Sequence, residues 1–235
     1  MKRALLFVLA LASLPAAVLS AAALPERIEA EYHIYKAGLL IGRVHELFVR
    51  NGDAYTIRSV TRSEGLLKIF LDDTLTVESE GRVIPEGLQP LKYEFRRANN
   101  TSRDIRATFD WKKGVMHSEY RGEAKDVDLP AGTQDRLSVL YQFMNLPQNG
   151  ERVRMQVSNG RKVDLYTYMK TDEPRLKTPA GDFETRHYER VTETERESRA
   201  QVWVAKDRFN LPVRIVFEDS NGLSLEQTLA ELRTQ

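Results

Sequence analysis

Apolar and polar residues alternate with a period of two along most of the chain, and this pattern restricts the fold more than any other feature. In AEYHIYK (30–36), Ala30, Tyr32 and Ile34 alternate with polar side chains. The same spacing recurs in LKYEFRR (91–97), DIRATFDW (104–111), RVRMQVS (152–158) and PVRIVFE (212–218). Successive side chains of a strand point to opposite faces, so each segment predicts a strand with one apolar and one polar face. Such strands are typical of antiparallel sheets with one face in water.

Turn signals separate these segments. Asn51-Gly52, Asn159-Gly160 and Asn221-Gly222 lie between strand-like runs, and Asn-Gly supplies the positive φ angles that tight hairpins need. We expect further turns at Asn149-Gly150 and over Thr178–Asp182. The signals delimit about a dozen strands. Since no linker, low-complexity tract or repeat divides the chain, we expect a single β-rich domain over residues 24–235.

Two segments fit the pattern less well. GLLKIF (65–70) is short and apolar, and it suits either a helical turn or a strand. LSLEQTLAEL (223–232) spaces its leucines at helical intervals, but it follows an Asn-Gly turn after a strand. We therefore expect a strand in the second segment.

The N-terminus predicts export. Met1-Lys2-Arg3 is positively charged, residues 4–24 carry no charge, and small residues occupy Ser20–Ala23. This order indicates a cleavable signal peptide over residues 1–23. The apolar run is also long enough for an uncleaved membrane anchor, but Pro15 and the small residues favour cleavage. We therefore expect no integral membrane segment in the mature chain.

Composition narrows the classes of partner and site. The chain has no cysteine, which excludes disulfides, thiolate metal sites and a lipid anchor on an N-terminal cysteine. Lys and Arg number 35 against 34 Asp and Glu, and the two signs are interspersed, as in ERVTETERESR (189–199). Without a basic stripe, we expect no nucleic-acid partner.

One segment, GTQDRLSVLYQFMN (132–145), departs from the strand pattern and predicts a helix. Thr133 is a suitable N-cap, Asp135 lies in the first turn, and Pro147 follows the segment. One helical face carries Leu137, Leu140, Tyr141 and Met144, and the apolar surface extends to Val139, Phe143 and Leu146. A helix this short needs packing for stability, and one apolar on most sides needs cover on more than one side.

The simplest host for this helix is the concave face of a curved sheet. We therefore expect a mainly β fold, with a single curved antiparallel sheet in the form of a half-open barrel and one central helix on its concave face. Two interpretations of the helix stay open: it is ordinary core, or it lines a cavity for an apolar guest. In the second case the candidate ligand-binding residues are Leu137, Leu140, Tyr141, Phe143 and Met144.

Five stretches, SEGLLKIF, TFDWKKG, TQDRLSVLYQF, LKTPAGDFET and VWVAKDRFNLPVRI, resemble in the same order an exported bacterial family catalogued as domain of unknown function 3108. The resemblance extends from about residue 28 to residue 232 and implies a periplasmic protein, with no established activity. Trp203, Asp207, Leu211 and Pro212 are distantly similar to elements of periplasmic lipoprotein carriers, in which a curved half-open sheet closed by helices holds acyl chains. The second similarity concerns the fold type and is only an analogy for function.

No motif in the sequence indicates catalysis. A nucleophile elbow, a P-loop and a G-x-G-x-x-G loop are all missing, and the start of a zinc-helix motif at His45-Glu46 fails because position 49 is Val. The four histidines, His33, His45, His117 and His187, lie on different predicted strands without metal-ligand spacing. We predict no catalytic residue, no metal and no cofactor.

These features predict an exported, non-enzymatic periplasmic protein that binds an apolar or lipid-like ligand. One alternative is an envelope protein-interaction module without a ligand, which would use a strand edge or the charged convex face. Another is a hydrolase with a carboxylate pair, which only distances between side chains could reveal.

Overall fold

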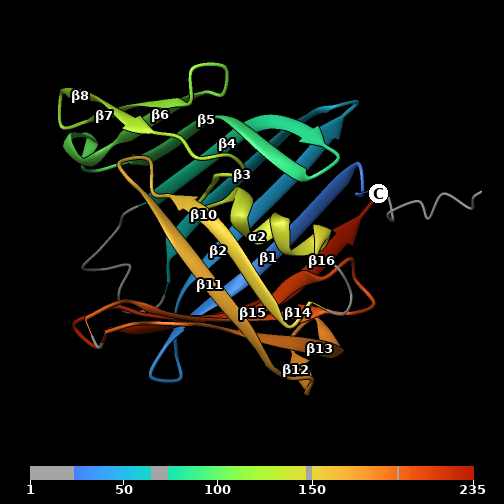
Figure 1. Ribbon diagram of the computed structural model, residues 1–235. Helices are drawn as coiled ribbons and strands as arrows, with labels where there is room; N and C mark the ends of the chain where they lie inside the picture. The colour runs from blue at the N-terminus through green and yellow to red at the C-terminus, as the bar shows by residue number, and fades with distance from the viewer. Residues whose placement is uncertain (1–23, 65–73, 147–149, 195) are drawn as a thin grey trace, which may run out of the picture.

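The structure is a computed structural model and describes residues 24–64, 74–146, 150–194 and 196–235. The predicted signal peptide, the ambiguous segment 65–70 and Asn149 lie outside the described residues. The described residues form sixteen strands, two 3-10 turns and a short α-helix (Figure 1). The strands are β1 (Arg27–Lys36), β2 (Leu39–Asn51), β3 (Ala54–Ser63), β4 (Thr74–Ile84), β5 (Gly87–Arg97), β6 (Ile105–Asp110), β7 (Val115–Tyr120), β8 (Glu123–Asp128), β9 (Gln134–Asp135), β10 (Arg152–Ser158), β11 (Val163–Asp172), β12 (Arg175–Thr178), β13 (Gly181–Arg190), β14 (Arg199–Ala205), β15 (Leu211–Glu218) and β16 (Ser224–Thr234). The helical elements are η1 (Thr101–Arg103), α2 (Ser138–Gln142) and η2 (Phe143–Asn145).

All strands join one sheet in the order β8-β7-β6-β5-β4-β3-β2-β1-β16-β15-β14-β13-β11-β10-β9, with β12 paired to β13. Two meanders, β1 to β8 and β13 to β16, thus meet where β1 pairs with β16. The pairing runs from Ile28 opposite Thr234 to Tyr35 opposite Glu226. The β9–β10 pair is parallel, and the other pairs are antiparallel.

The sheet is strongly curved and remains open between its ends. β1 to β5 lie on one side of α2, and β10 and β11 cross on the other side (Figure 1). The curvature brings the β10–β11 turn against the opposite meander, where the Ser118 hydroxyl donates to the Gly160 carbonyl at 2.6 Å. The expected half-open sheet with one helix on its concave face is confirmed.

The alternation and the turns also hold at residue level. The buried residues of β1 are Ile28, Ala30 and Tyr32, which alternate with less buried residues as the sequence pattern predicts. Asn51 ends β2 at a tight turn before Ala54, while Asn159-Gly160 and Asn221-Gly222 connect their predicted strands. The tail forms β16, so the expectation of a strand there is confirmed.

The central helix is shorter than the sequence predicts. Regular α-helix covers Ser138–Gln142 and continues as a 3-10 turn through Asn145. Gln134 and Asp135 instead pair with Val157 and Ser158 of β10 in a short parallel ladder, and the Asp135 N–H donates to the Ser138 hydroxyl at 2.9 Å. Both residues therefore have partners in an extended conformation, and the helix begins after them. The expectation that Thr133 caps the helix is wrong, since its hydroxyl donates to the Pro130 carbonyl at 2.7 Å.

Candidate functional site

Helix α2 lies between two apolar clusters of the concave face. Leu137 and Tyr141, both buried, belong to one cluster, together with Ile28, Phe48, Tyr55, Ile57, Leu88 and Leu211. Phe143, which is 1% exposed, belongs to the other, together with Val139, Val153, Met155, Val157, Tyr168, Tyr188, Val202 and Val204. The helix therefore joins the two halves of the sheet.

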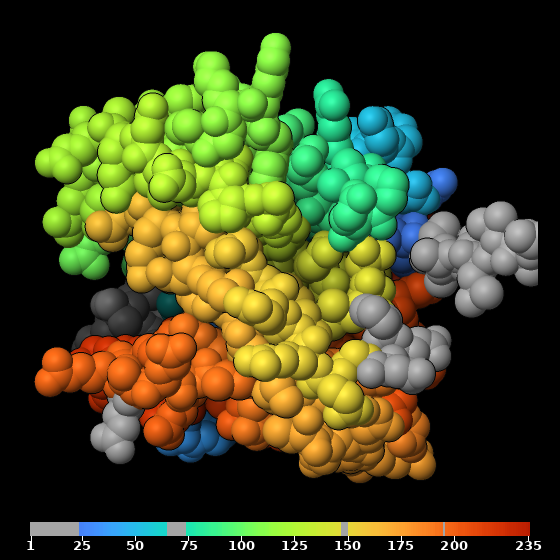
Figure 2. Space-filling view, viewed as in Figure 1, coloured from blue at the N-terminus to red at the C-terminus, as the bar shows by residue number. Residues whose placement is uncertain are grey.

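The remaining two candidate residues lie at the boundary of these clusters. Leu140 is half-buried and packs against both clusters, and Met144 is half-buried against the first. Figure 2 shows yellow atoms of the α2–η2 segment at the surface, beside the green atoms of the β4–β5 turn. The structure thus places Leu140 and Tyr141 in α2, Leu137 just before it, and Phe143 and Met144 in η2. Leu137, Tyr141 and Phe143 are buried, and Leu140 and Met144 are half-buried.

The N-terminal end of α2 is fixed by a buried carboxylate. Asp135 is 0% exposed, and its Oδ1 accepts hydrogen bonds from the backbone N–H groups of Leu137 and Ser138, each at 2.8 Å. Its Oδ2 accepts from the Ser79 hydroxyl of β4. Asp135 therefore caps the helix in place of Thr133, and it ties the helix to the sheet.

Two glutamines attach the same segment to the β4–β5 turn. The Gln142 Oε1 accepts from the Leu88 N–H at 3.0 Å, and its Nε2 donates to the Glu86 carbonyl at 2.8 Å. The Gln134 Nε2 donates to the Leu88 carbonyl at 2.6 Å. Gly87, between these contacts, has φ +120°, and a Cβ there would lie 2.2 Å from the Gln142 Oε1. Position 87 therefore needs glycine for both its backbone angle and its contact with Gln142.

A second buried carboxyl, Glu46, contacts the middle of the helix. Glu46 is 3% exposed and lies on the apolar face of β2 between Val44 and Phe48. The Tyr141 hydroxyl donates to its Oε1 at 2.8 Å, and Ser59, its partner on β3, also hydrogen-bonds to it. Burial raises the pKa of Glu46 to about 7, although the two hydroxyl contacts oppose the shift.

Glu46 is not among the functional residues predicted from the sequence. HELFV (45–49) fails as a zinc motif, but its alternation places Glu46 in phase with Val44 and Phe48. An ionisable residue at an apolar position of a strand is the signal that identifies it, because such a group is rarely buried without a partner.

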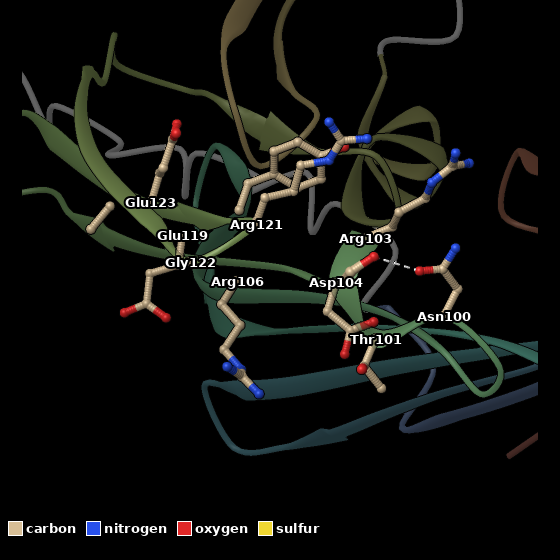
Figure 3. A pocket seen from close by; sticks show the side chains of 12 residues that line it. Asn100, Thr101, Arg103, Asp104, Arg106, Glu119, Arg121, Gly122 and Glu123 are labelled. Atoms are coloured by element: carbon tan, nitrogen blue, oxygen red, sulfur yellow. Dashed lines mark hydrogen bonds between the residues drawn. The ribbon is translucent and has the colours of Figure 1, made fainter.

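The hollow in Figure 3 lies at the tips of the β5–β6 and β7–β8 turns and encloses about 840 Å³. Its charged lining residues are Arg103, Arg106 and Arg121 against Asp104, Glu119 and Glu123. The side chains of Arg103 and Arg121 point to one side, and those of Arg106 and Glu119 to the other (Figure 3). Equal numbers of both signs leave no charge excess, as is usual for a solvated groove.

Three further hollows, of about 620, 590 and 230 Å³, lie on other parts of the sheet. None of these four hollows is lined by the five candidate residues of the helix. No helix of the described residues is long and apolar enough to span a membrane.

His33 and His45 lie on the neighbouring strands β1 and β2, whereas His117 and His187 lie on β7 and β13. His187 stacks on Trp203 with ring centroids 4.0 Å apart, and its Nδ1 lies 2.7 Å from Asp172 Oδ1. Across the described ranges, no group of three or more His, Asp or Glu side chains is placed to hold a metal ion. His187 therefore has a packing role on the sheet.

Three solved structures are similar to this chain at low identity and low TM-score. A candidate exported protein with a YmcC-like fold from Bacteroides fragilis is 11% identical at TM-score 0.34, with 89% of this chain and 96% of that chain covered. A candidate lipoprotein from Parabacteroides distasonis is 14% identical at TM-score 0.33, with coverage of 88% and 95%. A candidate outer membrane lipoprotein-sorting protein domain from Vibrio parahaemolyticus is 11% identical at TM-score 0.27, with coverage of 89% and 85%. At such scores these likenesses carry no argument about function.

A comparison with curated protein sequences gave no significant match. Residues 31–229 match the family model described as Protein of unknown function (DUF3108), which confirms the resemblance seen in the sequence. The chain therefore belongs to the DUF3108 family.

Proposed function

We propose that the protein is an exported, non-enzymatic binding protein of the bacterial periplasm, which holds an apolar or lipid-like ligand beside α2 on the concave face. The observation that carries the proposal is the position of Leu140 between the two apolar clusters. With Met144 it forms a half-buried apolar seam at the boundary of the two clusters. The predicted signal peptide supports export.

Binding at this seam needs little polar recognition. An apolar chain inserted between the clusters would gain roughly 25 cal/mol for each Å² of apolar surface removed from water. Leu137, Tyr141 and Phe143 would form the wall behind the ligand, while Leu140 and Met144 would contact it directly. The ligand would separate the two clusters locally without breaking the cap at Asp135.

Native mass spectrometry of the mature protein, purified without detergent and extracted in parallel with organic solvent, tests the proposal. We expect a co-purifying mass that extracts as an apolar molecule. The variant Met144→Asp should lose it and should also lose binding of the apolar fluorescent probe N-phenyl-1-naphthylamine, while keeping the wild-type circular dichroism spectrum. Leu165→Asp is the matched control, because Leu165 is 46% exposed on β11 and belongs to neither cluster.

If wild type carries no extractable mass and does not bind the probe, the helix is ordinary core and the proposal fails.

The alternative, an interaction module without a ligand, receives little support from the exposed edge strand β8. β8 carries Glu123, Lys125, Asp126 and Asp128 along its six residues, and charged edge strands disfavour the addition of a further strand.

A further inference from the structure

The contact between Glu46 and Tyr141 links α2 directly to the middle of the sheet. Both side chains are nearly inaccessible, at 3% and 2% exposure, and their oxygens lie 2.8 Å apart. The Tyr141 ring stacks on Phe48, which lies on β2 with Glu46; the ring centroids are 5.0 Å apart and the interplanar angle is 18°. Any movement of the helix away from β2 must therefore break this hydrogen bond and this stack together.

Among the described residues, no positive charge balances Glu46. β1 presents Tyr32, β3 presents Ser59, and α2 presents Tyr141. Burial raises the pKa of both tyrosines well above the ordinary value, so both stay neutral. Within the described part of the chain, no Lys, Arg or His forms an ion pair with Glu46.

We propose that Glu46 and Tyr141 form a pH-dependent latch, in which neutral Glu46 holds α2 on the sheet and ionised Glu46 loosens it. The neutral carboxyl accepts from Tyr141 and needs no counter-ion. An ionised carboxylate in the same apolar position has only hydroxyl donors, and its desolvation is relieved when water enters or α2 moves outward. The latch needs no ligand, so the result of its test does not depend on the proposed function.

The direction of the pH effect follows from the shift. The pKa of Glu46 is raised from 4.5 to about 7 in the folded chain, so the latch is fully closed at low pH. Its stabilisation is lost as pH rises from 4.5 through about 7, and no further loss follows above that range. Loosening α2 would uncover Phe48 and Tyr141 of the first apolar cluster, beside Leu140.

Hydrogen exchange followed by mass spectrometry tests the latch on the full mature chain between pH 5 and pH 8, after correction for intrinsic exchange rates. We expect protection of residues 137–146 to fall by about tenfold to a hundredfold relative to β14. In Glu46→Gln, which cannot ionise, this relative protection should not change with pH. An equal fall in wild type and Glu46→Gln would overturn the proposal.

Two further measurements keep the test decisive if Glu46→Gln folds poorly. Carbon-13 NMR of the glutamate carboxyl groups in wild type should show one that titrates near neutral pH, whereas titration of all of them below pH 5.5 would overturn the latch. Tyr141→Phe removes a hydrogen bond that lowers the pKa of Glu46, so the loss of protection should move to higher pH. A purely structural tyrosine would leave this midpoint unchanged.

Discussion

Two buried carboxyl groups flank the same short helix, and they are stabilised in different ways. Asp135 receives two backbone N–H groups and the Ser79 hydroxyl, at the end of the helix where the backbone dipole favours a negative charge. Glu46 receives only hydroxyl groups, from Tyr141 and Ser59. Burial raises the pKa of both groups. The two carboxyl groups are therefore equally buried but differ in role. Asp135, with backbone N–H donors, caps the helix, whereas Glu46, with hydroxyl donors alone, forms a titratable contact.

The largest expected effect is on the cap. Asp135→Ala leaves the N–H groups of Leu137 and Ser138 and the Ser79 hydroxyl without their acceptor, so we expect it to lower the free energy of unfolding by about 3–5 kcal/mol. Urea unfolding at pH 6 measures this loss. Asp219→Ala is the control, since Asp219 also accepts two backbone N–H groups but lies at an exposed turn. A loss no larger than that of the control would remove the contrast between buried and exposed caps.

The next effect concerns Glu46 and depends on pH. A pKa raised from 4.5 to about 7 corresponds to a destabilisation of about 3 kcal/mol above pH 7, and to none below pH 4.5. Glu46→Gln should therefore raise the free energy of unfolding by up to this amount at pH 8 and by little at pH 4. Urea unfolding across this range, with Glu29→Gln on the outer face of β1 as control, measures the difference. A pH-independent effect of Glu46→Gln would contradict the comparison.

The smallest effect is expected for the Tyr141 hydroxyl, which joins α2 to Glu46 on β2. Tyr141→Phe should lower the free energy of unfolding by about 1–2 kcal/mol at pH 5, because the acceptor Glu46 stays buried without this donor. Thermal unfolding under the same conditions measures the loss. Tyr188→Phe is the control, since the Tyr188 hydroxyl contacts the Gly150 carbonyl at 3.3 Å and no carboxyl group. Equal losses in the two variants would show that the carboxyl partner adds nothing.

The sequence predicts the sheet well because its signals are local. Alternation in segments such as 104–111 and 152–158 depends only on which face is buried, and Asn-Gly pairs impose their turns without help from distant residues. The same reasoning placed an apolar helix on the concave face, although it did not decide which of its apolar residues enter the core.

The errors at the helix have a tertiary cause. Thr133 and Asp135 both suit a helix start, but the ladder of Gln134 and Asp135 with β10 delays the helix by several residues. The role of Glu46 was also beyond local rules, since its partner Tyr141 comes from an element 95 positions away. Only the three-dimensional structure shows which donors reach a buried acid.

The pairing of β1 with β16 also bears on the rate of folding. Each meander contains mainly contacts between neighbouring strands, which form quickly because the loops to be closed are short. The β1–β16 junction between the meanders, by contrast, includes Arg27 and Gln235. Their backbones exchange hydrogen bonds of 3.1 and 2.9 Å, although they lie near opposite ends of the described chain. We therefore expect the two halves to form first and their joining to limit the overall rate, so the interior that α2 fills would be the last part of the molecule to be enclosed.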